Sequence, residues 1–198
     1  MRSGNTVYNV GHFLTNIFFR FIIGWEIAGR ENIPQEGPLI VVSNHISNWD
    51  PIIISSALTR RIQFVAKKEL FEIPGVGNFL NYIDTIPIHR GRPDRKAIRN
   101  VFDVLESDGC LGLFPEGTRS KSGKLRKARR GIVMIALKSE VPILPLGLIN
   151  TTNPLSQKVK INIGQPFTLD EYYGEKLDKE EMKEVGSEIM DEIRELIK

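Results

Sequence analysis

The sequence predicts a single α/β domain in which a mostly parallel central sheet is flanked by helices. Short apolar runs typical of buried strands alternate along the chain with longer amphipathic segments typical of helices. The 198 residues match the length of one ordinary domain, and 41% of them are hydrophobic, which is enough for a core. We find no internal repeat, long linker or low-complexity stretch in this chain.

Residues 1–28 are predicted to form an amphipathic helical segment at a membrane interface, with the α/β domain covering residues 29–198. The segment is rich in Phe, Ile and Val, and Asn9, His12, Asn16 and Arg20 form one polar stripe on a helix. Because Arg20 interrupts the apolar stretch, a helix lying in one leaflet is favoured over a membrane span or a cleaved signal peptide. The alternative is a helix that packs on the protein's own core.

The elements of the domain follow from local patterns. Strands are expected wherever a short apolar run is bounded by polar or turn-forming residues, at 38–43, 62–66, 85–88, 110–114, 143–148 and 158–163. Helices are expected at 51–59, 93–107 and 127–139, with mixed helix and loop at 69–82. The first two helices begin at Asp-Pro or Pro-Asp pairs, which favour helix starts.

The carboxyl-terminal helix is the most clearly patterned element. Its apolar residues recur at helical spacing and are Met182, Val185, Ile189, Ile193, Leu196 and Ile197. Asp178 and Glu181 are placed like a capping box at its start. We therefore expect this helix to lie with one face on the sheet.

A histidine and a carboxylate occupy the tight connection between the first domain strand and the following helix. His45 comes shortly after the apolar run 38–42, and Asp50 precedes Pro51 at the helix start. In α/β sheets, ligands bind at this edge of the sheet. Residues five apart on a helix diverge by about 140°, so His45 must lie in the turn for the two side chains to meet. The alternative for Asp50 is a helix N-cap, and one carboxylate is able to fill both roles.

A second polar turn follows the strand at 110–114. Gly117 allows backbone N–H groups to approach an anion closely, and Arg119 is suited to clamp a phosphate with two hydrogen bonds. Thr118 and Ser120 add hydroxyl groups, and Glu116 is expected to accept from a substrate hydroxyl or to hold Arg119. The alternatives are an exposed loop charge for Arg119 and a salt bridge to a neighbouring base for Glu116.

The charges and the cysteine restrict the function classes. Seven bases and no acid lie between Arg119 and Arg130, which predicts an anionic partner such as a phosphate or a lipid headgroup. Aromatic residues do not interleave with these bases, so nucleic-acid binding is not expected. The single Cys110 excludes an intramolecular disulfide and favours a reducing compartment. The three histidines lack the spacing of metal ligands, so no metal site is expected.

Four ordered blocks resemble the glycerophospholipid acyltransferase family. Residues 44–50 (NHISNWD) are similar to its H-x4-D motif, and residues 114–120 (FPEGTRS) are similar to its F-P-E-G-T-R-S block. Residues 86–90 (IPIHR) resemble an apolar block that ends in Arg, and residues 141–146 (VPILPL) resemble its V-P-I-x-P-V block. His89 stands where that family has an acid, and Ala128-Arg129-Arg130-Gly131 where it has Phe-Lys-x-Gly. Within the family, the chain most resembles the small bacterial 1-acyl-glycerol-3-phosphate acyltransferases.

The resemblance implies transfer of an acyl chain from an acyl thioester, either acyl-CoA or an acyl-carrier protein, to the sn-2 hydroxyl of 1-acyl-glycerol-3-phosphate. It implies that His45 acts as the general base and is oriented by Asp50, without a metal or redox cofactor. The substrate-binding residues that it implies are Glu116, Gly117, Thr118, Arg119, Arg90 and Lys67. Membrane phospholipids are the expected surroundings, with the protein peripheral or monotopic on the cytoplasmic face of the cell membrane.

Two rival functions remain open from the sequence. One is acylation of glycerol-3-phosphate or of another lysophospholipid, since the motifs do not separate these acceptors. The other is a non-catalytic lipid-binding module that uses the basic residues 119–130.

Overall fold

The computed structural model describes residues 24–89, 91 and 93–198. The strands are β1 (Glu26–Ala28), β2 (Leu39–Ser43), β3 (Ile62–Lys67), β4 (Ile86–Ile88), β5 (Cys110–Leu113), β6 (Ile143–Ile149) and β7 (Lys160–Ile163). The helices are α2 (Asp50–Ala57), α3 (Val76–Tyr82), α4 (Arg95–Glu106), α5 (Arg130–Ser139) and α6 (Glu181–Leu196). Short 3-10 helices are η2 (Arg30–Asn32), η3 (Lys68–Glu72) and η4 (Asp170–Tyr172).

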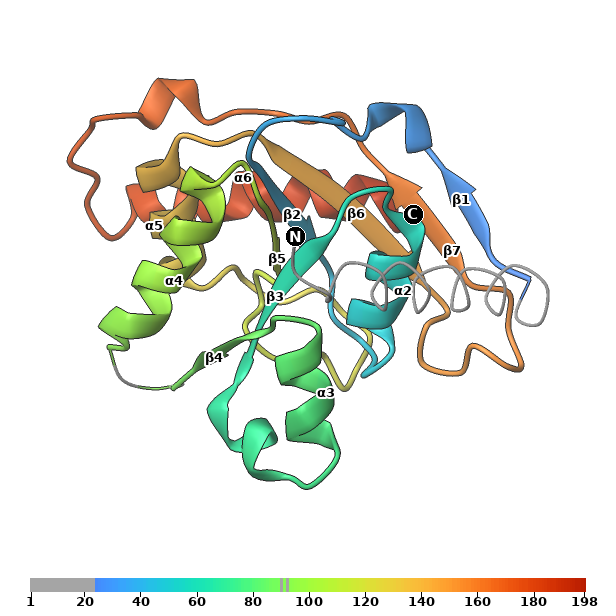
Figure 1. Ribbon diagram of the computed structural model, residues 1–198. Helices are drawn as coiled ribbons and strands as arrows, with labels where there is room; N and C mark the ends of the chain where they lie inside the picture. Colours follow the sequence, from blue (N-terminus) through green and yellow to red (C-terminus); the bar gives the residue numbers. More distant parts are fainter. Residues whose placement is uncertain (1–23, 90, 92) are drawn as a thin grey trace.

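The strands form one seven-stranded sheet in the order β1-β7-β6-β2-β5-β3-β4 (Figure 1). Every neighbouring pair is parallel except β6 and β7, which are antiparallel. The predicted α/β fold with a mostly parallel sheet is therefore confirmed. Because β2 lies between β6 and β5, the carboxyl ends of these three strands meet at the centre of one edge of the sheet.

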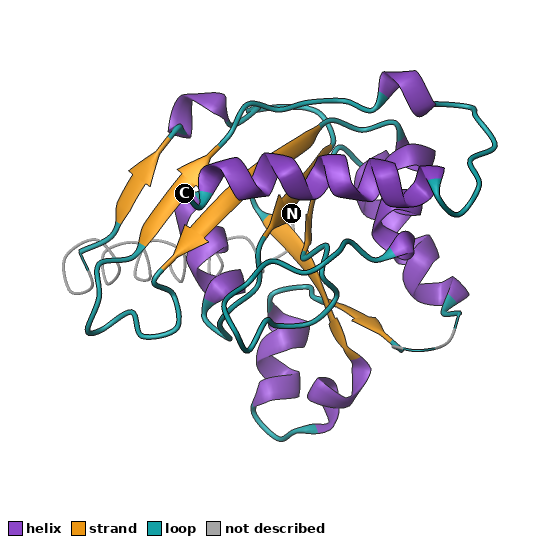
Figure 2. Ribbon diagram, turned by 180° about the vertical axis from the view of Figure 1, so that it is seen from behind, coloured by secondary structure: helices purple, strands orange, loops and turns teal. Residues whose placement is uncertain are grey.

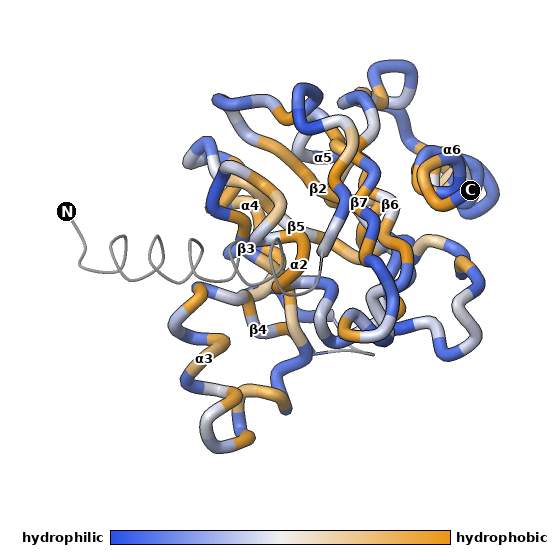
Figure 3. Tube along the Cα trace, turned by 90° about the vertical axis from the view of Figure 1, so that its right-hand side faces the viewer, coloured by the Kyte–Doolittle hydropathy of each residue, from blue (hydrophilic) through white to orange (hydrophobic). Residues whose placement is uncertain are grey.

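The two faces of the sheet build two hydrophobic clusters. Along β2, Ile40 and Val42 face the cluster formed with α4, α5 and α6. Leu39 and Val41 face the opposite cluster, which contains the buried side of α2. This alternation is the period of two expected for a strand that is covered on both faces. Figures 2 and 3 show α6 lying across one face of the sheet, with α2 on the other.

The helix ends follow the local signals that the sequence carries. The Asp94 carboxylate caps α4 by accepting from the Ala97 N–H at 3.1 Å. The capping box of α6 is confirmed, since Glu181 N–H donates to Asp178 Oδ1 at 3.0 Å and Asp178 N–H donates to Glu181 Oε2 at 2.6 Å. These contacts fix where both helices begin.

The amino-terminal prediction needs one correction. Residues 26–28, which we placed in the membrane-interface helix, form β1 and pair in parallel with β7 from Glu26↔Lys160 to Ala28↔Asn162. The pairing supplies backbone partners to an outer strand of the sheet, so the domain begins before the predicted boundary at residue 28. Residues 1–23 lie outside the described part, and the rest of that prediction falls on them. Within the described ranges, the chain has no helix with the length and apolar character that a membrane crossing requires.

The connection from β3 to β4 carries η3 and α3 outward, beyond the carboxyl end of β3 (Figure 1). Gly77 allows this excursion to fold tightly, because a Cβ at that position would lie 2.0 Å from the Phe71 carbonyl oxygen. The excursion and the carboxyl ends of the strands together surround the candidate site.

Candidate active site

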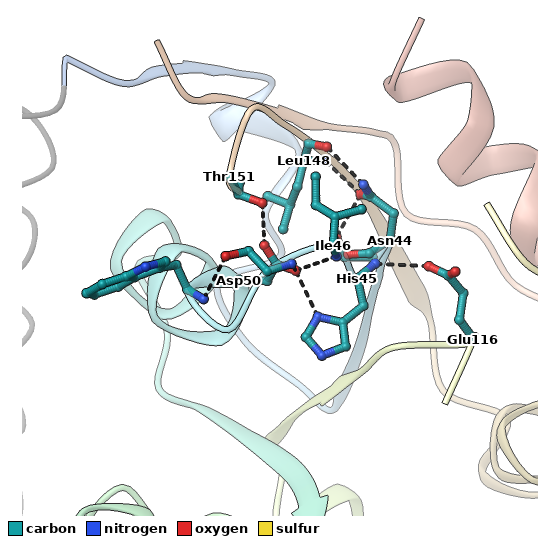
Figure 4. A network of polar contacts seen from close by, with 10 residues as sticks. Asn44, His45, Ile46, Asp50, Glu116, Leu148 and Thr151 are labelled. Carbon is teal, nitrogen blue, oxygen red and sulfur yellow. Dashed lines mark hydrogen bonds and ion pairs between the residues drawn. The ribbon is translucent and has the colours of Figure 1, made fainter. Parts of the chain in front are cut away.

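His45 and Asp50 meet in the turn between β2 and α2, as predicted. Nδ1 of His45 lies 2.8 Å from Oδ2 of Asp50, and Figure 4 shows the second ring nitrogen pointing away from that carboxylate. Because a carboxylate accepts and does not donate, Nδ1 carries the proton, and in the neutral ring Nε2 keeps its lone pair. The His45 side chain is 14% exposed and lines a cavity, so a basic nitrogen is offered to a bound molecule.

The Asp50 carboxylate is completely buried and fully engaged. Oδ2 also accepts from the backbone N–H groups of Ile46 at 2.8 Å and Ser47 at 2.7 Å, and Oδ1 accepts from the Thr151 hydroxyl at 2.5 Å. The predicted N-cap role of Asp50 is wrong: Asp50 is the first residue of α2, and its carboxylate turns back onto the preceding turn instead of capping the helix. These four contacts hold one orientation of the carboxylate and, through it, of the His45 ring.

The second polar block packs directly on His45. The ring of Phe114 stacks on the imidazole with centroids 3.9 Å apart and planes 17° from parallel. The Ser120 N–H donates to the His45 carbonyl oxygen at 2.7 Å. The His45 N–H donates to Glu116 Oε1 at 3.0 Å. The ring, the N–H and the carbonyl of His45 are thus each held by residues from 114–120.

Glu116 differs from the prediction of a substrate contact. Its side chain is 1% exposed, and its second oxygen accepts from the Arg126 N–H at 3.1 Å, so the carboxylate points into the protein and bonds to backbone groups. No bond to Arg119 is needed to explain its placement. Burial raises the pKa of Glu116, opposed by its bonds to the His45 and Arg126 N–H groups. Glu116 therefore links the turn of His45 to the basic segment.

The Glu116→Gln variant tests whether burial raises the pKa of Glu116. Because the pKa of Glu116 is raised in the folded protein, the stability it contributes is present below the ordinary glutamate pKa and is lost as pH rises through the raised value. We expect the wild type to gain stability relative to Glu116→Gln, which does not titrate, as the pH is lowered through that window. Urea unfolding of both proteins over a pH series measures the difference, and a constant difference contradicts the assignment.

The site opens into a cavity of about 1000 Å³ with a mainly apolar lining. His45, Phe64 and Phe114 line it, together with apolar residues of the excursion and of α4. Its volume falls in the range of small-molecule sites, and its apolar walls suit a hydrocarbon chain. The second histidine of the described chain, His89, also borders this cavity.

Only some of the other predicted binding residues line the cavity. Gly117 and Lys67 line the cavity, and Lys67 forms an ion pair with Glu69 at 3.2 Å. Thr118 is half-buried and Arg119 is exposed, and neither belongs to the cavity lining. Arg90 lies outside the described residues.

Arg129 was not among the predicted substrate-binding residues, yet it lines the cavity. Its Nε donates to the Glu116 carbonyl oxygen at 3.4 Å, and its side chain runs beside Gly117, where a Cβ would lie 2.9 Å from Arg129 Cγ. Gly117 has φ of +66°, which together with this contact explains the need for glycine. A cation is thus held at the cavity by the turn that follows β5.

Two further positioning residues come from the β2–β6 side of the site. Asn44 bonds to both backbone groups of Leu148, with its amide donating at 2.9 Å and its Oδ1 accepting at 2.8 Å, and so ties the end of β2 to β6 (Figure 4). Thr151 follows β6 and reaches Asp50. Thr151 was not among the predicted site residues. Its position just after a predicted strand is the one feature of the sequence that could have indicated a role at the site.

Comparison with known proteins gives three consistent results. The family model described as "Acyltransferase" matches residues 24–149. A 1-acyl-sn-glycerol-3-phosphate acyltransferase of Borreliella burgdorferi is 33% identical over 140 residues, which cover 70% of this chain and 56% of that protein. The enzyme of the same name from Bacillus subtilis is 29% identical over 150 residues, covering 73% of this chain and 74% of that one.

A solved structure is also similar. The crystal structure of the 1-acyl-sn-glycerophosphate acyltransferase from Thermotoga maritima matches with a TM-score of 0.74 and 29% identity, covering 99% of this chain and 83% of that one. The matched segment spans little more than half of the Borreliella protein and 37% of a chloroplastic relative from Brassica napus.

Proposed function

The chain belongs to the acyltransferase family, and from this premise we propose that it transfers an acyl chain from an acyl thioester to the sn-2 hydroxyl of 1-acyl-glycerol-3-phosphate, giving phosphatidic acid. The observation that carries the proposal is the 2.8 Å contact between His45 Nδ1 and Asp50 Oδ2 at the wall of an apolar cavity. It supplies a general base beside a space for an acyl chain. The names of the relatives support the choice of acceptor.

The proposed reaction is direct attack by the lipid hydroxyl. His45 Nε2 takes the hydroxyl proton while the oxygen bonds to the thioester carbonyl carbon. The oxyanion then collapses, the C–S bond breaks, and the imidazolium returns its proton to the leaving thiolate. Asp50 stabilises the imidazolium and holds the ring in place through Nδ1.

The negative charge of the tetrahedral intermediate requires hydrogen-bond donors. Backbone N–H groups near the start of α2 are candidates for this role. The N–H groups of residues 45–47, 49 and 50 instead donate to protein acceptors. Asn48 and His45 both line the cavity, so we propose that Asn48 donates to the oxyanion.

We propose that the acceptor phosphate is bound by Arg129 at the Gly117 turn, with Arg119, Thr118, Arg90 and Lys67 retained as the other predicted contacts. Bound there, the phosphate holds the acceptor hydroxyl within reach of His45. The donor is acyl-CoA or an acyl-carrier protein, and no metal or redox cofactor takes part in the proposed steps. The proposed location is the cytoplasmic face of the cell membrane, in contact with phospholipid.

Exchange of single arginines separates these phosphate contacts. We expect Arg129→Met to raise the KM for lysophosphatidate by about tenfold, because a charge-assisted hydrogen bond to phosphate is lost. Arg119→Met, at an exposed position off the cavity lining, is the matched control and should change KM less. Initial rates over a range of acceptor concentrations measure both values. A larger rise in KM for the Arg119 variant would mean that Arg119, and not Arg129, is the main phosphate ligand.

Thr151 is expected to act through Asp50. Thr151→Val keeps the shape but leaves Asp50 Oδ1 without its hydroxyl donor, so we expect kcat to fall about tenfold with little change in KM. Thr151→Ser restores the donor and should restore most of kcat. Steady-state kinetics of the three proteins check this. Equal kcat for the valine variant and the wild type would mean that Thr151 is not needed to position Asp50.

The choice of acceptor is tested by release of free thiol. Purified protein is supplied with one acyl thioester and, in turn, with lysophosphatidate, glycerol-3-phosphate or lysophosphatidylcholine. We expect rapid thiol release with lysophosphatidate, whose phosphate and acyl chain both have a place in the site. Faster release with glycerol-3-phosphate would transfer the proposal to that acceptor, and no acceptor-dependent release would remove it.

A further inference from the structure

Five large apolar side chains on the excursion between β3 and β4 are exposed and follow one another at intervals of three residues. We call them the apolar flank; they are Leu70, Ile73, Val76, Phe79 and Tyr82, each between 40% and 47% exposed. In the described part of the chain, only Trp49 and Leu155 are large apolar residues with comparable exposure. A concentration of this kind marks a surface that contacts an apolar partner.

The apolar flank is also the outer wall of the cavity that contains His45. All five side chains line that cavity while remaining exposed, so the cavity is open along η3 and α3 instead of being closed by them. Figures 1 and 2 show η3 and α3 extending away from the sheet and its covering helices, and Figure 3 shows hydrophobic residues distributed along them. An apolar partner on the flank would therefore be continuous with the site.

The lining of the same cavity also includes a cation from the turn that follows β5. Gly117, Arg129 and Gly131 line it, and Arg129 belongs to the segment 119–130 with seven bases and no acid. Exposed apolar residues and a cation in the lining of one cavity match a surface that offers hydrocarbon and phosphate together, as an anionic lipid bilayer does. The exposed residue Trp49 lies in the sequence between the cavity residues Asn48 and Pro51, and Trp is favoured at the interface of a bilayer.

We propose that the apolar flank contacts the membrane directly, with its side chains in the acyl region of one leaflet and the open side of the cavity facing lipid. This surface is distinct from the predicted amino-terminal segment and lies within the described fold. A lipid acceptor then enters the cavity sideways and keeps its acyl chain in an apolar environment throughout. That consequence rests on the proposed function, whereas the membrane contact itself does not.

Vesicle binding by the full chain tests the contact without turnover. The vesicles contain phosphatidylglycerol and phosphatidylcholine, and binding is measured by co-sedimentation. We expect the double variant Ile73→Ser with Phe79→Ser to lower partitioning about tenfold, because apolar area leaves the acyl region. Leu155→Ser, at the 76% exposed residue outside the flank, is the matched control and should partition like the wild type. Unchanged partitioning of the double variant overturns the proposal.

A second measurement reports depth directly and does not depend on the serine variant's folding. Phe79→Cys and Leu155→Cys are labelled with an environment-sensitive fluorophore; the native Cys110 is 2% exposed, and burial raises its pKa to about 12, so it does not compete. Lipids brominated in their acyl chains should quench the label at 79 and not that at 155. Equal quenching at both positions, or none, overturns the proposal.

Two other occupants of the flank would give a different result. If another part of the chain or a second copy covers the flank, the label at 79 is already shielded from a water-soluble quencher without vesicles, and the proposal fails. The outcomes also separate this proposal from the proposed function. Vesicle contact through position 79 without acyl transfer would contradict the proposed function only. Acyl transfer with an unquenched label at position 79 would contradict the proposed membrane contact only.

Discussion

Replacing His45 by alanine is expected to lower kcat for acyl transfer about 10²–10⁴-fold, because the acceptor hydroxyl loses its general base. The fold should survive, since the loop is also held by the backbone bonds of residue 45 to Glu116 and Ser120. Steady-state rates with lysophosphatidate, together with binding to vesicles, measure both properties. Loss of turnover with retained vesicle binding distinguishes an enzyme from a non-catalytic lipid-binding module.

The chain offers a matched control for this variant. His89 also lines the cavity, and its backbone N–H donates to Asp94 Oδ2 at 2.9 Å. We expect His89→Ala to keep most of kcat. Similar losses in the two variants would mean that a histidine at the cavity matters for packing and not for proton transfer.

Replacing Asp50 by asparagine is expected to have the second large effect, with kcat lowered about 10³–10⁴-fold. The amide carries no negative charge to stabilise the imidazolium, and its NH2 group replaces one of the two oxygens that accept from the groups around the carboxylate. Because the site is completely buried, the free energy of unfolding should also fall by about 1–3 kcal/mol. Rates and urea unfolding of the same preparation give both quantities.

Asp94→Asn separates the catalytic from the structural part of that loss. The Asp94 carboxylate likewise accepts from two backbone N–H groups, those of His89 and Ala97, and caps α4. We expect this variant to lose about 0.5–2 kcal/mol of stability and to keep most of kcat. If Asp50→Asn behaves in the same way, Asp50 is a structural residue only.

Much of the fold was predictable because its signals are local. The buried strands are short apolar runs, and the helices carry start signals that the structure uses, such as Asp94 and the Asp178–Glu181 pair. β1 was missed because its three residues gain their stability from pairing with β7, more than 100 positions later in the chain. A strand of that length has no pattern of its own.

In the site, too, contacts within one turn could be predicted from the sequence, and contacts between distant segments could not. His45 and Asp50 were predictable because they lie in one turn, and their contact follows from the strand-turn-helix geometry. Thr151 reaches Asp50 from a separate strand end, so its contact depends on β6 lying beside β2. The block at 114–120 was interpreted as a substrate-binding turn, whereas Phe114, Glu116 and Ser120 hold His45. Sequence patterns identify such a block without revealing which of its side chains face inward.

Mass spectrometry of the lipid product tests the central claim most directly. The wild type and the His45→Ala variant are each incubated with vesicles containing 1-acyl-glycerol-3-phosphate and, in separate reactions, an acyl-CoA or an acyl-carrier protein that carries a chain of a different length. The account predicts phosphatidic acid that carries the new chain at the sn-2 oxygen, formed by the wild type and reduced at least about 100-fold in the variant. Formation of that product by the variant at the wild-type rate, or its absence with the wild type and either donor class, would contradict the account.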